Sequence, residues 1–576
     1  MSQSSSRQME GKRQTGRRTL AQRMMKKCEC IDGDTSIRKL PRKEVMKDPQ
    51  NRLAKYEIGG SKPASGSGKV LMLVGATGAG KSTLINGIVN YVYGVRWEDN
   101  FRFKLIVDEG VEPQSQSQTK WITAYTLPYR KGFILPHTLT VIDTPGFGDT
   151  EGIQADENLT NQIREFFNKG GSIGVDQLDG ICFVVQASLP RLTHTQKYIF
   201  SSILALFGKD VETIVNLLIT FCDNKTPPVL AAIKDAHIPH TSSFTFNNSA
   251  FSVSSSDKPD STHLGMAFWK MGTKSFRKFF KSFQKNDPVS LTLTKEVLEQ
   301  RKHLETLLQG ILPQLKTALG MLEQLRETHA ALRQHKTEMD ANRDFTFTVK
   351  VSKHRKVELH PGTHVTNCLK CCFTCHYPCY IPKDKDKARC AAMHHDDGVQ
   401  RCAVCPMKCL PIPLHVNNQF RFEFYEEEET HTYFEVKRKY EAATERHLKY
   451  QGLLKALCKD FIEERMKLLE LTRKAHECLQ ELERIALKPN PLSIQEYIDI
   501  LIETEKREAK LGYTQRIKYL ADAKEKGQLA EKLKGNFNPF EEYMKDFGEK
   551  GMDISLFDPD PVKDEALAAG AEYCTN

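Results

Sequence analysis

The feature that most constrains this 576-residue chain is a phosphate-binding loop in its first hundred residues. Five apolar residues, Val70 to Val74, predict a buried strand, and a helical pattern begins at Thr83. Between them, residues 75–82 read GATGAGKS and match GxxxxGK[ST] at every position, in the strand–loop–helix context that the motif needs. The pattern indicates a nucleoside triphosphate site; the alternative is a glycine-rich turn without a ligand.

The residue types in this loop suit bound phosphate. Glycines allow backbone N–H groups to converge on the ligand, and the N-terminus of the following helix adds positive potential. Lys81 is predicted to contact the β- and γ-phosphates and to act in catalysis, and Ser82 to bind Mg²⁺. The predicted nucleotide-binding residues of the loop are Gly75, Ala76, Thr77, Gly78, Ala79, Gly80, Lys81, Ser82 and Thr83.

Two further segments are predicted to complete the magnesium and γ-phosphate end of the site. An apolar strand runs into Asp143-Thr-Pro-Gly146, a DxxG pattern in which Asp143 holds Mg²⁺ and the Gly146 N–H contacts the γ-phosphate. The polar segment 112–120 precedes a strand, 121–127, expected at the sheet edge, and Thr119 is the candidate for completing the Mg²⁺ shell and for catalysis. Position 147 is Phe, where many GTPases have a water-orienting Gln, so hydrolysis is expected to be slow or to use groups from a partner or a second copy.

Strand ends later in the chain predict the base-binding end. The buried strands 180–186 and 216–221 follow one another, and Asp223 comes just after the second. A carboxylate there can accept hydrogen bonds from guanine N1–H and N2–H₂. A short strand, 242–246, ends in Asn247 and Asn248, whose amides are predicted to close over the base.

Together, the motifs GATGAGKST, DTPGFGDT, RLT, TFCD and FNN resemble those of the septin-like GTPases. Within that group the chain is most similar to the immunity-associated nucleotide-binding proteins (GIMAPs) and their chloroplast-import relatives, over roughly residues 68–285. The resemblance implies a Ras-like, doubly wound α/β domain, GTP or GDP with Mg²⁺, and dimerisation between GTPase domains when GTP is bound. Phe221 stands where the NKxD pattern has Lys, which weakens the argument for guanine and leaves an ATPase as an alternative.

Helical periodicity organises the second half. Apolar residues recur with 3/4 spacing over 304–325 and again over 454–482, and Pro313 is expected to kink or interrupt the first run. We expect two helices packed as an antiparallel coiled-coil stalk, with an intermolecular coiled coil as the alternative. Strands 345–351 and 420–424 alternate in polarity and predict a two-stranded extension of the stalk.

Nine cysteines at the tip of that extension predict structural zinc. Three CxxC pairs have the spacing at which two thiolates converge on one tetrahedral ion, and the segment is too poor in aliphatic residues to fold on its own core. We expect one or two structural Zn²⁺ ions, with Cys368, Cys371, Cys402 and Cys405 as the preferred quartet, and unpaired reactive thiols as the alternative. The candidate ligands are Cys368, Cys371, Cys372, Cys375, Cys379, Cys390, Cys402, Cys405 and Cys409, with His376, His394, His395 and His415 nearby.

The net charge of +10 is concentrated at the start, where residues 1–70 hold 17 basic and 7 acidic side chains. The first 60 residues are predicted to be a largely disordered arm, preferably a solvated tail, with RNA or an anionic membrane surface as alternative contacts. Nothing approaches the apolar run that a transmembrane helix requires, and no hydrophobic signal core is present. We therefore expect a soluble, cytoplasmic protein whose 16 cysteines are thiols or metal ligands.

The expected organisation is a basic arm and linker (1–67), a GTPase domain (68–285), a first stalk helix (286–343), a β-ribbon with a Cys-rich zinc module (344–426), a second stalk helix (427–486), a C-terminal helical region (487–549) and an acidic tail (550–576). The expected function is that of a slow Mg²⁺-dependent GTPase that forms a homodimer or oligomer through its GTPase domain and signals through a stalk with a zinc-bound tip. The alternatives are a zinc and coiled-coil scaffold in which nucleotide is structural, and a nucleic-acid-binding protein that uses the basic arm and zinc tip.

Overall fold

The computed structural model describes residues 18–31, 34–59, 68–107, 120–147, 153–251, 259–334, 346–359, 361–379, 381–396, 398–432, 450–489 and 513–534, with a few single positions between 435 and 545. The chain divides into two compact units, one made of residues 1–298 with 485–497 and the other of 299–484 with 498–576. Within the ranges described, no helix is both long and apolar enough to cross a membrane.

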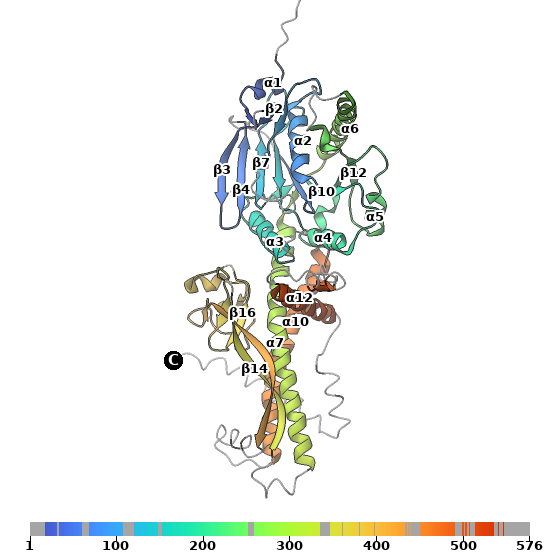
Figure 1. The fold of residues 1–576 in the computed structure, drawn as a ribbon. Coiled ribbons are helices and arrows are strands. Elements are labelled where there is room, and N and C mark those ends of the chain that lie inside the picture. Colours follow the sequence, from blue (N-terminus) through green and yellow to red (C-terminus); the bar gives the residue numbers. More distant parts are fainter. Residues whose placement is uncertain are drawn as a thin grey trace, which may run out of the picture. The chain divides into compact units, whose positions relative to one another are not determined.

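The first unit is built on an eight-stranded sheet (Figure 1) with the strand order β12-β11-β10-β5-β8-β7-β4-β3. Neighbouring strands run parallel through the first five members of this order, from β12 to β8. Strand β7 is antiparallel to β8, and β3 is antiparallel to β4. The carboxyl ends of the parallel strands therefore meet at one edge, where ligands bind in open α/β sheets. The bounds are β3 Arg42–Asp48, β4 Leu53–Ile58, β5 Lys69–Gly75, β7 Ile122–Leu127, β8 Leu139–Asp143, β10 Gly180–Gln186, β11 Val215–Thr220 and β12 Ser242–Thr245.

Helices cover both faces of this sheet because successive side chains of its strands point to opposite sides. In β5, Leu71 belongs to one buried core and Met72 to the other. The first core includes apolar residues of α2 and α6, and the second includes those of α3, α4 and α5. The helices are α2 Lys81–Tyr93, α3 Ile153–Asn168, α4 His194–Leu204, α5 Val229–Asp235 and α6 Pro259–Phe283. The unit is thus an α/β layer structure wound on both faces, as expected.

The prediction of a disordered arm over 1–67 is wrong for residues 18–31 and 34–59, which are folded. They form α1 (Leu20–Met25), strands β1 (Glu29–Ile31) and β2 (Asp34–Lys39), and then β3 and β4 of the main sheet. Few residues in this stretch are apolar, but Met24, Leu40 and Ile58 are fully buried, whereas most of edge strand β3 is exposed. The average composition of the stretch does not reveal that its few apolar residues are placed where they become buried. Because β4 pairs with β7, the strand expected at the edge is an interior one.

Three long helices belong wholly or largely to the second unit (Figure 1). They are α7 (Thr292–Gln334), α10 (Tyr450–Ile485) and α12 (Tyr513–Lys534). Pro313 lies inside α7, which continues through it as one helix, so the predicted interruption is wrong. Apolar residues of the predicted stripes are buried on both α7 and α10. Their packing as an antiparallel coiled coil stays a prediction.

A long β-ribbon carries the Cys-rich module. Strands β14 (Thr346–Glu358) and β20 (Phe420–Thr432) pair antiparallel in continuous register, from Thr346 opposite Thr432 to Glu358 opposite Phe420. Basic residues of β14 lie beside acidic residues of β20, and Lys353 pairs with both Glu427 and Glu429. Both strands extend beyond their predicted bounds, because the pairing continues through a run of glutamates, 426–429, that lacks the alternation in polarity used to predict strands.

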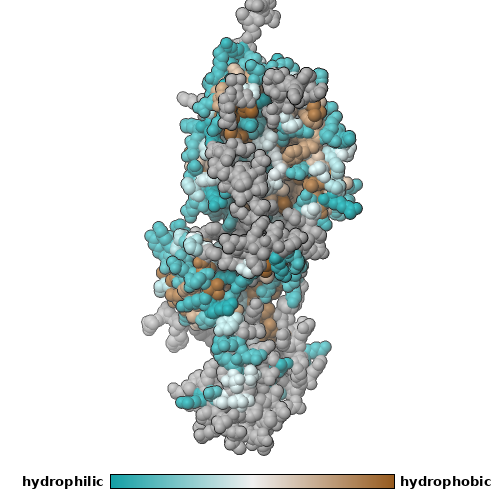
Figure 2. Space-filling view, viewed as in Figure 1, coloured by the Kyte–Doolittle hydropathy of each residue, from teal (hydrophilic) through white to brown (hydrophobic). Residues whose placement is uncertain are grey.

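Between the two ribbon strands, short strands fold around an interior made largely of thiols. These are β15 Thr366–Cys368, β16 Phe373–His376, β17 Met393–Asp396, β18 Val399–Cys402 and β19 His415–Val416. Eight of the nine predicted cysteine ligands lie in or against this core, whose other buried members are Phe373, Ala392 and Val404. On the outside, brown and teal atoms are mixed over the module (Figure 2), and Leu369, Met407 and Ile412 are each about half exposed.

Candidate functional site

The phosphate loop connects β5 to α2 at the carboxyl edge of the sheet. Gly78 and Gly80 adopt φ values of 76° and 91°, in the left-handed region, and Gly80 is the residue that caps α2. At Gly75, a Cβ would lie 2.4 Å from the Val184 carbonyl oxygen of the neighbouring strand β10. Glycine is therefore required at these positions by backbone geometry, in agreement with the motif. Thr83, the last residue predicted for the loop, is exposed in the first turn of α2.

The Lys81 side chain lies along the phosphate loop, where it is predicted to contact the β- and γ-phosphates. Its Nζ donates to the carbonyl oxygens of Gly75, at 3.1 Å, and of Ala76, at 3.0 Å. The side chain is largely buried, so its ammonium group is held over the loop rather than extended into solvent. This position allows the lysine to exchange carbonyl contacts for phosphate contacts with little movement.

Asp143 ends β8 beside Ser82, and the two side chains form a candidate magnesium site. The Ser82 hydroxyl donates to Asp143 Oδ2 at 3.5 Å. Asp143 is 1% exposed, and its Oδ1 has no hydrogen-bond partner in the part of the chain that the structure describes. Burial raises the pKa of Asp143 to about 7, and the nearby Lys81 ammonium opposes that rise. A buried carboxylate oxygen without a partner beside a hydroxyl is the oxygen-donor set that Mg²⁺ prefers, so these residues fit the ion.

The DxxG segment lies directly against the phosphate loop. The Phe147 N–H donates to the Gly75 carbonyl oxygen at 3.2 Å, and the Thr77 N–H donates to the Phe147 carbonyl oxygen at 3.1 Å. A Cβ on Gly146 would lie 2.3 Å from Thr77 Oγ1, so only glycine allows this approach. The Phe147 ring is fully buried in the core shared with α3 and α4 and cannot orient water at the site. Thr119 and residues 148–152 lie outside the described residues.

Two residues that the sequence did not single out support the loop from neighbouring strand ends. Thr220 Oγ1, at the end of β11, lies 2.8 Å from the Ala79 carbonyl oxygen and 3.1 Å from that of Val185. Gln186 Nε2, at the end of β10, donates to the Gly78 carbonyl oxygen at 3.2 Å. Both are the last residues of parallel strands, and Gln186 also ends the predicted strand 180–186, whereas the predicted strand 216–221 ran one residue past Thr220. A polar residue at the carboxyl end of such a strand was the signal that could have identified them.

The predicted base-binding residues follow β11 and β12. Asp223 is exposed, and one carboxylate oxygen accepts from the Lys225 N–H at 3.0 Å. The Asn247 amide is engaged within the protein: its Nδ2 donates to the Cys222 carbonyl oxygen at 2.9 Å, and its Oδ1 accepts from Ser249. Asn247 therefore ties the two base loops together. Phe221, with φ of 55°, is 60% exposed and lies near Gly80 of the phosphate loop.

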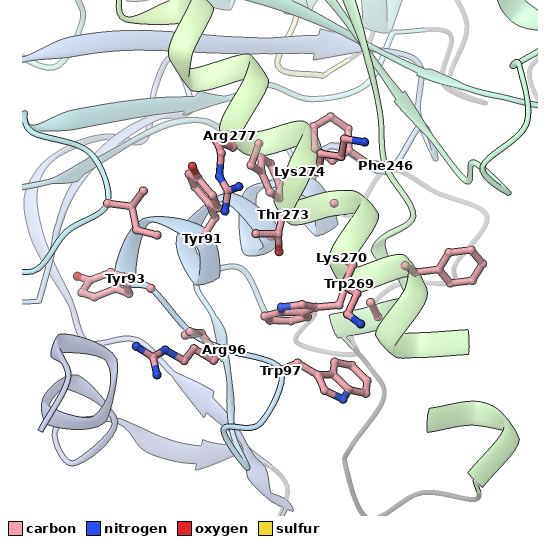
Figure 3. Close-up of a pocket in the computed structure, with 18 of the residues that line it drawn as sticks. Tyr91, Tyr93, Arg96, Trp97, Phe246, Trp269, Lys270, Thr273, Lys274 and Arg277 are labelled. Carbon is pink, nitrogen blue, oxygen red and sulfur yellow. The ribbon is translucent and has the colours of Figure 1, made fainter. Parts of the chain in front are cut away.

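A separate cavity of about 830 Å³ lies between the end of α2 and α6 (Figure 3). Tyr91, Trp97 and Trp269 supply aromatic surface, and four basic side chains line it, namely Arg96, Lys270, Lys274 and Arg277. Asn247 and Asn248 also line it, but none of residues 75–83 does. The cavity is thus distinct from the phosphate loop and touches the nucleotide site only at its predicted base end.

The Cys-rich module contains three groups of potential metal ligands within the described residues. They are Cys368, Cys371, Cys405 and Cys409; Cys375, Cys402, Cys405 and His415; and His376, Cys379 and Cys390. The preferred quartet is corrected, because Cys402 groups with Cys375 and His415 rather than with Cys368 and Cys371. Cys372 belongs to none of the groups; its thiol donates to the Leu369 carbonyl oxygen at 3.8 Å. His376 and His415, which the sequence indicated only as neighbours, belong to these groups of potential ligands.

Comparisons with known proteins agree with the geometry of the phosphate loop. Residues 70–217 match the family described as "50S ribosome-binding GTPase", so this part of the chain is a P-loop GTPase domain. A comparison with the sequences of curated proteins finds no match.

Solved structures give weaker likenesses. Toc33 from Arabidopsis thaliana, in complex with Mg²⁺ and GMPPNP, is 16% identical with a TM-score of 0.22, over 36% of this chain and 85% of its own. A dimerisation-deficient R130A mutant of Toc33 gives the same values. The bacterial dynamin GTPase LeoA from ETEC is 11% identical with a TM-score of 0.22, over 72% of this chain and 62% of its own.

Proposed function

We propose that this chain is a GTP-binding protein and a slow, Mg²⁺-dependent GTPase with a zinc-bound, Cys-rich module. The observation that carries the proposal is the buried Oδ1 of Asp143, which has no hydrogen-bond partner among the described residues. Asp143 accepts a hydrogen bond from Ser82, and Lys81 donates to a carbonyl oxygen of the phosphate loop. An unpartnered buried carboxylate costs free energy unless a cation meets it. Mg²⁺ delivered with a nucleoside triphosphate would meet that need and supply charge stabilisation for phosphoryl transfer.

Slow turnover is proposed from the side chains near the γ-phosphate position. Phe147 is buried, so it offers no group to orient the attacking water. Thr119, proposed to complete the Mg²⁺ shell, is one candidate source of catalytic groups, and a partner protein or a second copy of the chain is another. We also propose that the chain assembles through its GTPase domains. Contacts with the γ-phosphate would order residues 113–119 and 146–150, and the ordered segments would form the dimer surface.

Guanine selectivity is proposed from Asp223, which is exposed at the end of the sheet and free of ion pairs among the described residues. A carboxylate there accepts from guanine N1–H and N2–H₂, donors that adenine does not present together. The Phe221 ring would provide apolar contact beside the phosphate loop in place of the stem of a lysine.

The test compares GTP with ATP, for binding and for turnover, on the unchanged chain and on Lys81→Ala. We expect selective GTP binding, weakened in the variant by roughly tenfold to a hundredfold, because hydrogen bonds to charged groups contribute about 1.5–3 kcal/mol. Lys234→Ala removes an exposed lysine from α5 and serves as the matched control with unchanged affinity. Failure to bind either nucleotide would refute the proposal.

The alternative of a scaffold with structural nucleotide is favoured by the same buried Phe147. Turnover separates the two functions, since a scaffold would retain GTP without releasing phosphate. Sedimentation with a non-hydrolysable GTP analogue tests assembly separately: a chain that stays monomeric with the analogue bound would remove dimerisation from the proposal and leave GTP binding standing.

A further inference from the structure

We infer that the Cys405 thiolate is shared by two zinc ions, one held by Cys368, Cys371 and Cys409 and the other by Cys375, Cys402 and His415. This inference rests on the zinc part of the proposed function and specifies its site. It makes the pair of ions one dinuclear centre at the middle of the module. The set His376, Cys379 and Cys390 is a different group with no shared member.

The count of ligands supports a shared thiolate. Each of the two groups offers four ligand atoms that lie within 4.8 Å of one another, and Cys405 is a member of both. Two tetrahedral ions need eight coordination positions, and seven side chains fill them only if one side chain serves twice. Cys405 is the one residue placed to do so, and all seven side chains are buried or half-buried.

The separation of the Cys371 and Cys409 sulfurs fits a common metal and excludes a disulfide between them. The Sγ atoms of Cys371 and Cys409 are 3.7 Å apart, far beyond the S–S bond length of about 2.05 Å. In a tetrahedron with Zn–S bonds of about 2.3 Å, neighbouring sulfurs lie about 3.8 Å apart. The protein therefore holds these thiols at the spacing that the ion would impose.

Backbone N–H groups favour the thiolate form at the shared end of the centre. Cys402 Sγ accepts from the N–H groups of Val404 and Cys405, both at 3.4 Å, and Cys405 Sγ accepts from that of Cys409 at 3.4 Å. Hydrogen bonds to ligating sulfur orient it and stabilise its negative charge. The second CxxC turn thus presents both of its sulfurs to the interior of the module.

His415 supplies independent evidence for a metal. The side chain is 1% exposed, and its Nδ1 lies 2.9 Å from the Leu410 carbonyl oxygen, so Nδ1 carries the proton. Its Nε2 is then an acceptor that makes no hydrogen bond of normal geometry in the part of the chain that the structure describes, although the ring lies beside the sulfurs of Cys368 and Cys405. A buried imidazole nitrogen whose partner nitrogen donates to a carbonyl is the arrangement of a zinc-ligating histidine.

The first experiment measures metal content in the full chain by inductively coupled plasma mass spectrometry. Cys379→Ser with Cys390→Ser removes the separate group, and this double variant is expected to retain two zinc ions per chain. Adding Cys372→Ser, the cysteine outside all three groups, should leave two ions and controls for the loss of a thiol. One ion per chain, or iron in place of zinc, would overturn the inference.

The second experiment tests sharing directly. The double variant, produced with Co²⁺ in place of zinc, should give an electron paramagnetic resonance intensity well below that of two independent ions, because a bridging thiolate couples their spins. In the unchanged chain loaded with ¹¹³Cd, two resonances should show scalar coupling to each other, which requires a common ligand. Two ions with additive intensity and uncoupled resonances would overturn the shared thiolate while leaving zinc binding intact; a chain without metal would overturn both.

Discussion

The phosphate loop and the DxxG segment approach each other so closely that only a glycine fits at position 146, at the γ-phosphate end of the site. Gly146 and Thr77 come from segments almost seventy positions apart, and a Cβ on Gly146 would lie 2.3 Å from Thr77 Oγ1 and 2.5 Å from Thr77 Cα. Real Cβ atoms do not approach backbone so closely, so the phosphate loop itself would have to move. The glycine of DxxG thus shapes the loop in addition to offering its N–H group.

We expect Gly146→Ala to destabilise the first unit by about 1–3 kcal/mol and to weaken GTP binding, since overpacking displaces the loop. Gly272→Ala, in α6, is the matched control, because a Cβ there meets nothing within 4 Å. Replacing glycine inside a helix should instead stabilise by up to about 1 kcal/mol. Thermal unfolding and GTP titration of both variants check this; equal behaviour of the two would contradict it.

Introducing at position 147 the glutamine that many GTPases have there is not expected to produce a faster GTPase. The Phe147 side chain is fully buried in the core, so Phe147→Gln would bury an amide and lose ring contacts, at a cost of roughly 3–5 kcal/mol. Phe147→Leu, which keeps an apolar side chain, is the control and should bind GTP normally. An increase in turnover for Phe147→Gln with unchanged melting temperature would show that this side chain can reach the attacking water.

At the scale of elements, the parallel strands around the nucleotide site could be predicted to within a residue or two, because buried apolar runs and the phosphate motif coincide there. The strand 180–186 was predicted with its observed bounds, and β11 was displaced by a single residue. Strands β3 and β4 could not be recognised from the sequence. Strand β3 is an exposed edge strand rich in charge, and it joins the main sheet only because it pairs with β4, which in turn pairs with β7. Grouping of the cysteines also depends on tertiary contacts that CxxC spacing does not encode.

Charged side chains join the ribbon to α12 within the second unit. Glu423 of β20 pairs with Arg355 of β14, at 3.0 Å, and with Lys518 of α12. Burial raises the pKa of Glu423, but hydrogen bonds from Lys518 and Arg355 outweigh it and hold the pKa below its usual value. Because the pKa in the folded state is the lower one, the stabilisation is present above the unfolded pKa and is lost as pH falls through the folded value.

We therefore expect Glu423→Gln to destabilise the second unit at pH 7 by about 1 kcal/mol, a small value because the carboxylate is partly solvated. The difference in stability between the variant and the unchanged chain should shrink as pH falls below the usual glutamate pKa, and it should vanish once the pH is below the depressed folded value, because Glu423 is then protonated in both states. Glu428→Gln, an exposed glutamate of the same strand, is the control and should behave as the unchanged chain at every pH. Denaturant unfolding measured across pH decides the matter, and a constant difference down to pH 3 would contradict the argument.

For the whole molecule, the two units are expected to depend on different ligands. The first has two extensive apolar cores, whereas the Cys-rich module of the second has a core made mainly of thiols. A zinc chelator should therefore unfold the module while Mg²⁺ and GTP still raise the melting temperature of the first unit. Calorimetry with each ligand and with the chelator provides the measurement. Equal sensitivity of both transitions to the chelator would show that the units do not unfold separately.

The thiol-lined interior of the Cys-rich module also has a consequence for the living cell. A core of leucine and valine forms wherever water surrounds the chain, but a core of cysteine persists only while a metal is supplied and oxidants are scarce. Oxidation of Cys405 would remove a ligand from both ions of the proposed centre at once. The folded fraction of this module would then follow the zinc supply and redox state of its compartment, and chains made under oxidative stress would accumulate with an intact GTPase domain and an unfolded module.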